Sequence, residues 1–63
     1  MTKQEAIAAI EAWIKAYSLF TASAVSITPA ENGGWVALVE CSELLWEQKV
    51  SPAGEVSAPV WVD

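Results

Sequence analysis

The sequence predicts one small α+β domain, in which an amphipathic N-terminal helix packs on a three- to four-stranded antiparallel meander sheet. Three observations predict this fold class. The 63 residues suffice for a single hydrophobic core, apolar residues recur at helical spacing in the first third of the chain, and alternating apolar runs between turn residues fill the rest. No linker, repeat or low-complexity tract divides the chain, so we expect residues 1–63 to form one domain.

The helix is predicted over residues 3–19. Thr2 and Glu5 have the spacing of a capping box, in which the hydroxyl and the carboxylate bind backbone N–H groups that the first turn leaves free. A stripe of apolar residues at helical spacing consists of Ile7, Ile10, Ile14 and Tyr17, widened by Ala6, Trp13 and Phe20. We expect this stripe to face the sheet.

Four strands are predicted, over residues 22–28, 35–41, 44–50 and 55–62. In the first strand, alternation places Val25 and Ile27 on one face and smaller residues on the other. The second strand is apolar on both faces, which is typical of a central strand. Pro59 removes a backbone donor from the last strand, so we expect it at an edge of the sheet.

Turn residues separate most of these strands. Pro29–Gly34 contains an Asn-Gly pair suited to positive φ, and Ser51–Gly54 has Pro and Gly in favourable turn positions. The link Ser42-Glu43 has neither Gly nor Pro, so its residues do not favour the backbone angles of a tight hairpin turn. There a bent strand with a bulge fits the sequence as well as a turn does.

The charge balance excludes several classes of ligand. Eight acidic residues face three lysines, and arginine is absent, for a net charge of −5. Nucleic-acid binders need a basic surface against phosphates, and anionic lipid headgroups make the same demand. We therefore expect no direct nucleic-acid binding and no membrane partner, and we expect a charged protein partner to be basic.

The residues that usually perform catalysis are also scarce. Without histidine the chain has no Ser–His or Cys–His pair, and a zinc site would need an unusual ligand set. Cys41, the single cysteine, lies on the apolar central strand, where we expect a small buried hydrophobe rather than a reactive thiol. We predict no catalytic site, no metal and no cofactor, and hence a protein that is not an enzyme.

No targeting or membrane segment is predicted. Glu5 and Glu11 interrupt any apolar region near the N-terminus. The longest uncharged run, residues 16–30, is rich in Ser and Thr and reaches a proline, unlike a membrane span. The expected location is the cytoplasm.

The tryptophans and one group of carboxylates are the candidates for partner contact. Trp13 and Trp35 are expected in the core, whereas Trp46 lies among charges and Trp61 near the C-terminus, and both are candidates for exposure. Exposed aromatic residues with an acidic rim are typical of protein interfaces. The predicted partner-binding residues are Glu40, Glu43, Trp46, Glu47 and Trp61. The alternative is that the carboxylates only keep the sheet solvated and its edges unpaired, and that Trp61 belongs to the core.

About half of the chain resembles the helix-plus-meander of the gas vesicle protein O family. The residues that carry the resemblance are Gly34-Trp35, Val39-Glu40, Glu43-Leu44, Trp46-Glu47 and a Pro-Ala-Gly-Glu turn. The arginine-rich final strands of that family and a stretch of loop are missing, so the resemblance assigns neither family nor function.

These observations favour a non-enzymatic interaction module, a small acidic protein that binds a larger partner and blocks or modulates it. One class of this kind, by analogy of size and charge, is phage-encoded inhibitors of host defence complexes, anti-CRISPR proteins among them. The alternative is a structural or assembly subunit. Hydrophobic residues make up 54% of the chain, more than a short monomer readily hides, and a homodimer joined by pairing of sheet edges would bury part of them.

Overall fold

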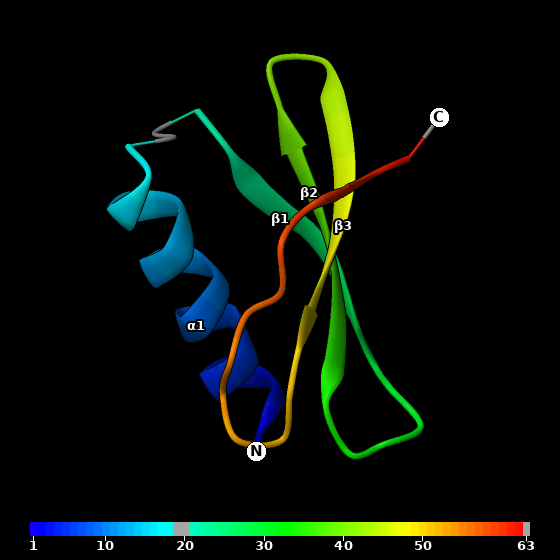
Figure 1. Cartoon of the computed structure of the whole chain (residues 1–63). Helices are drawn as coiled ribbons and strands as arrows, with labels where there is room; N and C mark the ends of the chain where they lie inside the picture. Colours follow the sequence, from blue (N-terminus) through cyan, green and yellow to red (C-terminus); the bar gives the residue numbers. More distant parts are fainter. Residues whose placement is uncertain (19–20, 63) are drawn as a thin grey trace.

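The protein is a helix over a four-stranded antiparallel sheet. The computed structural model describes residues 1–18 and 21–62. The elements are α1 (Lys3–Ala16), β1 (Ser23–Pro29), β2 (Trp35–Cys41), β3 (Leu44–Val50) and β4 (Val60–Trp61). The strands are ordered β1-β2-β3-β4, and α1 lies across one face of the sheet (Figure 1). The predicted α+β class is confirmed, with β2 in the interior as predicted.

The start of α1 is built as predicted. The Thr2 backbone N–H donates to Glu5 Oε1 at 2.8 Å, and the Glu5 backbone N–H donates to Thr2 Oγ1 at 3.2 Å, which completes the capping box. The bond from the Thr2 backbone, helped by its hydroxyl, lowers the pKa of the Glu5 carboxyl. The helix ends earlier than predicted, at Ala16 with Tyr17 as its C-cap. The predicted last residue, Leu19, lies outside the described residues, as does Phe20. The described helix is too short and too polar to span a membrane.

The core lies between α1 and the central strands. It consists of Ala6, Ile10, Ile14, Ala37, Val39, Trp46 and Val50. Trp13 and Trp35, which were expected inside, are half-buried at its margin. Tyr17 was predicted as part of the buried stripe, but it is 64% exposed and stacks on Trp13 with 4.5 Å between ring centroids. The helix has ended at this position, so Tyr17 no longer follows the buried stripe.

A β-bulge in β1 overturns the predicted alternation of that strand. Ala24 pairs with Val39 and Ser26 with Leu38, so Val25 is an extra residue between two adjacent pairs. Ala24 and Ile27 consequently pack against the core, while Val25 is 57% exposed. Strict alternation put Val25 on the face of Ile27, which is wrong because an inserted residue reverses the faces that follow it.

The last predicted strand is interrupted around Pro59. Of residues 55–62, only Val60–Trp61 form a strand, and Val56 makes an isolated bridge to Val50. Between them a side chain contributes to the ladder, since the Lys49 N–H donates to Ser57 Oγ at 2.8 Å. The Ser57 N–H in turn donates to the Lys49 carbonyl at 2.8 Å. The edge position predicted for this segment is confirmed by β4.

Candidate interaction surface

The link Ser42-Glu43 is a tight two-residue turn. Cys41 pairs directly with Leu44, and φ is 46° at Ser42 and 74° at Glu43. Two central residues with positive φ are what a type I′ hairpin turn requires. The segment from residue 35 to residue 50 is therefore two strands and not one bent strand. Neither turn residue is Gly or Asn, so the backbone of the tip is strained by roughly 1–2 kcal/mol per residue.

The outer face of the sheet, the face turned away from α1, collects two of the predicted carboxylates. Glu40 pairs with Leu45 and Glu47 with Leu38, while Ala37 and Val39 on the same strand as Glu40 are buried toward the helix. Glu40 and Glu47 are therefore diagonal neighbours on the outer face. Glu43 is exposed at the hairpin tip beside them.

Four apolar side chains share the outer face with these carboxylates. They are Val36, Leu38, Leu45 and Val60. Glu47 lies in their midst, paired with Leu38 on one side and with Val60 on the other, and it is half-buried. No described helix or strand packs on this face (Figure 1). The outer face is thus an open surface on which apolar side chains flank a central carboxylate. Ser26, Thr28 and Lys49 lie on the same face.

Trp46 lies on the opposite face, and its predicted exposure is wrong. It is only 4% exposed, and its indole N–H donates to Gln48 Oε1 at 2.8 Å. Gln48 is itself fully buried, and its Nε2 donates to the Ser57 carbonyl at 3.0 Å. The charged neighbours of Trp46 in sequence point away from it because the strand alternates, so proximity to charge along the chain did not indicate exposure.

Trp61 is 64% exposed, in line with its prediction, but it too lies on the helix side of the sheet. It pairs with Trp46, and the two rings meet edge to face. The five predicted partner-binding residues therefore do not form one surface. Glu40 and Glu47 share the outer face with apolar residues that were not predicted as partner-binding, and Glu43 lies at the hairpin tip. On the other face Trp61 is exposed and Trp46 is buried in the core.

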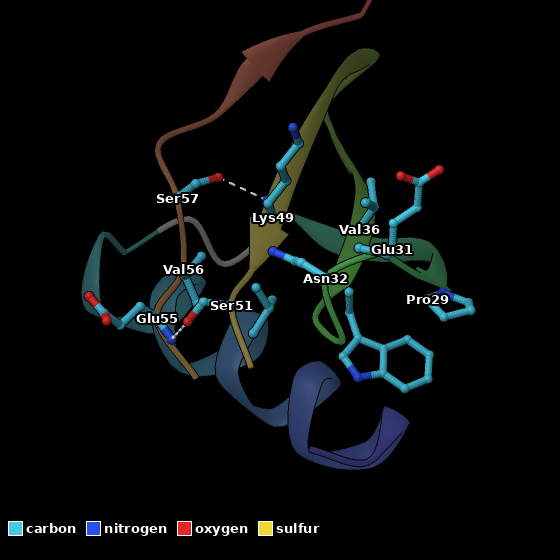
Figure 2. A pocket seen from close by; sticks show the side chains of 12 residues that line it. Pro29, Glu31, Asn32, Val36, Lys49, Ser51, Glu55, Val56 and Ser57 are labelled. Atoms are coloured by element: carbon cyan, nitrogen blue, oxygen red, sulfur yellow. Dashed lines mark hydrogen bonds between the residues drawn. The ribbon is translucent and has the colours of Figure 1, made fainter. Parts of the chain in front are cut away.

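A groove continues the outer face toward the loops. Val36 and Lys49 of the outer face line it together with Glu31 and Asn32 of the β1–β2 loop and Glu55 and Ser57 of the C-terminal segment (Figure 2). Asn32 holds its loop by accepting the Gly34 N–H at 3.0 Å. Lys49 is the one cation among these lining residues, and Glu31 and Glu55 add carboxylates to an already acidic region.

The described residues offer little to a metal ion. No three His, Cys, Asp or Glu side chains among them gather in a way that could hold one. Cys41 is half-buried rather than fully buried, and its Sγ lies 3.3 Å from Thr21 Oγ1. The thiol thus has a hydroxyl partner at the margin of the core.

A scan against protein-family models and searches of curated proteins and of solved structures each found no significant match to the chain. The class that the fold defines is a small α+β domain with a helix over a meander sheet. Its function has to be argued from its own surface.

Proposed function

We propose that this protein is a non-enzymatic binding domain that docks the outer face of its sheet on a basic surface of a larger protein, and so blocks or modulates that partner. The observation that carries the proposal is the position of Glu47, a half-buried carboxylate between Leu38 and Val60 on a face that no described element covers.

The apolar residues of the outer face supply a reason to bind. Burying the side chains of Val36, Leu38, Leu45 and Val60 under a partner would remove apolar area from water, at about 25 cal/mol per Å². Apolar side chains are common at the centres of protein interfaces, and here they flank the central carboxylate of Glu47.

Glu47 supplies the selectivity. A partner that covers the outer face also removes water from this carboxylate, and an unpaired buried charge costs several kcal/mol. A partner with a Lys or Arg placed against Glu47 avoids that cost, whereas a neutral or acidic partner is rejected. Glu40 and Glu43 nearby, and the net charge of −5, favour the same partner through longer-range attraction.

A blocking role suits these features. A domain of 63 residues with no catalytic constellation acts on a larger protein by occupying its surface. If that surface normally binds nucleic acid, the carboxylates of the outer face would take the place of phosphates, as in phage-encoded inhibitors of host defence complexes. Competition between the protein and nucleic acid for the captured partner tests this finer proposal.

The alternative function, an assembly subunit joined through sheet edges, has less support. The outer side of β1 is unpaired among the described strands. However, the bulge at Val25 bends this edge and Pro29 at its end lacks a donor, and both features impede strand pairing. The outer face is therefore the better supported contact surface.

The test is affinity capture from the native host with matched variants. Wild-type protein, Leu38→Asp, Glu47→Lys and the helix-side control Lys3→Gln would be immobilised in equal amounts. We expect one partner to be retained by the wild type and by Lys3→Gln and lost from both outer-face variants. With the purified partner, binding should weaken as salt is raised, because opposite charges attract less under screening.

The proposal fails if the outer-face variants retain the same partner as the wild type. It also fails if the affinity of the purified complex is indifferent to salt. Circular dichroism of each variant checks that the fold is intact, and both substituted side chains point away from the core, so loss of binding is separable from unfolding.

A further inference from the structure

The charges of the chain are unevenly distributed between the two sides of the molecule. On α1, two lysines and two glutamates cancel, and β1 carries no charged side chain. In the remaining described residues, five glutamates are opposed by Lys49 alone. The side formed by α1 and β1 is therefore the neutral surface of an acidic protein, and it is where a second copy can approach without strong repulsion.

An open groove lies on this neutral side, between α1 and the start of β1. Its apolar lining comes from Ile7, Ile14, Ala22 and Ala24, and Glu11 and Lys15 line it as well. Glu11 and Lys15 are one helical turn apart, so they lie on the same side of α1. Because β1 is the edge of the sheet, the groove is accessible from the side of the molecule.

We infer that this groove is the contact surface of a homodimer, in which the α1 helices of two copies pack antiparallel. A two-fold axis that passes between Glu11 and Lys15 sets Glu11 of one copy against Lys15 of the second, and the reverse pair forms by symmetry. The apolar linings then meet on either side of the charged pairs. No strand pairing is needed, so the bulge in β1 is no obstacle.

The interface does not depend on the proposed docking of the outer face, which lies on the other side of the sheet. One helix side and one groove form a small contact, at the low end of specific interfaces. We therefore expect a reversible dimer with a dissociation constant of roughly 10–100 μM. Such a dimer presents two outer faces to its partner.

Sedimentation equilibrium from about 10 μM to 1 mM tests the inference across this range. Glu11→Lys and Lys15→Glu each convert both attractive pairs into repulsive ones, and each should weaken the dimer about tenfold or more. The double variant E11K/K15E restores complementary pairs and should dimerise like the wild type. An equimolar mixture of the two single variants should form a heterodimer more readily than either forms a homodimer.

The charge-reversed variants also separate local pairing from general repulsion. Glu11→Lys brings the net charge closer to zero, so general repulsion predicts tighter association, the opposite of what the pairing predicts. A wild type that stays monomeric at 1 mM, a Glu11→Lys protein that dimerises as well as the wild type, or a mixture with no preference for the heterodimer would each overturn the inference. Leu38→Asp on the outer face should leave the dimer unchanged, and dimerisation abolished by this variant would also count against it.

Discussion

The ring of Trp61 meets the ring of Trp46 edge to face, with 5.9 Å between the centroids and 89° between the planes. Trp61 is largely exposed, whereas Trp46 belongs to the core. The contact therefore attaches a strand of two residues, β4, to the interior of the protein. Edge-to-face aromatic pairs add about 0.5–1.5 kcal/mol beyond the area they bury.

Trp61→Ala should accordingly lower the free energy of unfolding by about 1–2 kcal/mol, measured by urea denaturation. The matched control is Val60→Ala, since Val60 is equally exposed in the same short strand but points to the other face. That substitution should cost about 0.5 kcal/mol or less. Equal losses for the two variants would show that the aromatic contact contributes nothing specific.

Gln48 is expected to be the least replaceable polar residue of the core. Gln48→Met keeps the size of the side chain but leaves the Trp46 indole N–H and the Ser57 carbonyl without their partner. We expect a loss of about 2–4 kcal/mol, because each buried group left unpaired costs about 1–3 kcal/mol. In a double-mutant cycle with Trp46→Phe, the combined loss should be smaller than the sum of the single losses, and strict additivity would argue against the network.

The hairpin tip can be made more stable. Replacing Ser42 by Asn together with Glu43 by Gly supplies residues that tolerate the positive φ found at both positions. The unfolding free energy should rise by about 1–2 kcal/mol, which corresponds to roughly 4–16 °C in the thermal midpoint of a domain this small. A variant with the same or a lower midpoint would contradict the type I′ geometry.

Gly34 should tolerate no side chain. It is buried, and a Cβ there would overlap the Val50 carbonyl oxygen, which belongs to the backbone and cannot move cheaply. Gly34→Ala should lower the unfolding free energy by about 2–3 kcal/mol. Gly33→Ala is the control. There φ is +86°, but a Cβ would meet only Pro52 Cγ at an ordinary contact distance of 3.8 Å, so the cost should be nearer about 1 kcal/mol. Similar losses at the two positions would refute the close approach.

Acid should loosen the start of α1. The folded-state pKa of Glu5 lies below the ordinary value of 4.5, so its contribution to stability is complete above that value and disappears as the pH falls through the lower folded pKa. Glu5→Gln should remove this part of the pH dependence between neutral and strongly acidic solution. Denaturant titrations of both proteins at several pH values measure it, and parallel pH profiles for the two proteins would disprove it.

Local rules anticipated the well-specified parts of the fold. The capping box at Thr2 formed as predicted, because it depends on hydrogen bonds between residues three apart. The strand around Val39, which is apolar on both faces, also formed as predicted, because alternation along the chain was enough to identify it. The bulge at Val25 escaped prediction because nothing in a run of small residues marks an insertion. The two-residue turn at Ser42-Glu43 was not predicted, because neither residue favours positive φ. It forms because pairing of the flanking apolar strands outweighs that cost.

The candidate surface was predictable only in part. The separation of Glu40 from Trp46 follows from strand alternation once the hairpin register is known, but that register depends on the length of the turn. With a two-residue turn, Glu47 falls beside Leu38 on the outer face and Trp46 falls inside. Leu38 belongs to the strand predicted as central because both its faces are apolar, but no described element covers the outer face of that strand.

The neutral helix side and the acidic sheet side give the molecule an electric dipole. The electric field of a basic partner orients such a molecule during the diffusional encounter, so that its more negative side faces the partner before contact. Orientation during approach raises the rate of productive encounters but hardly affects how long a formed complex lasts. Added salt should therefore lower the association rate constant of this protein with a basic partner far more than it raises the dissociation rate constant of the complex.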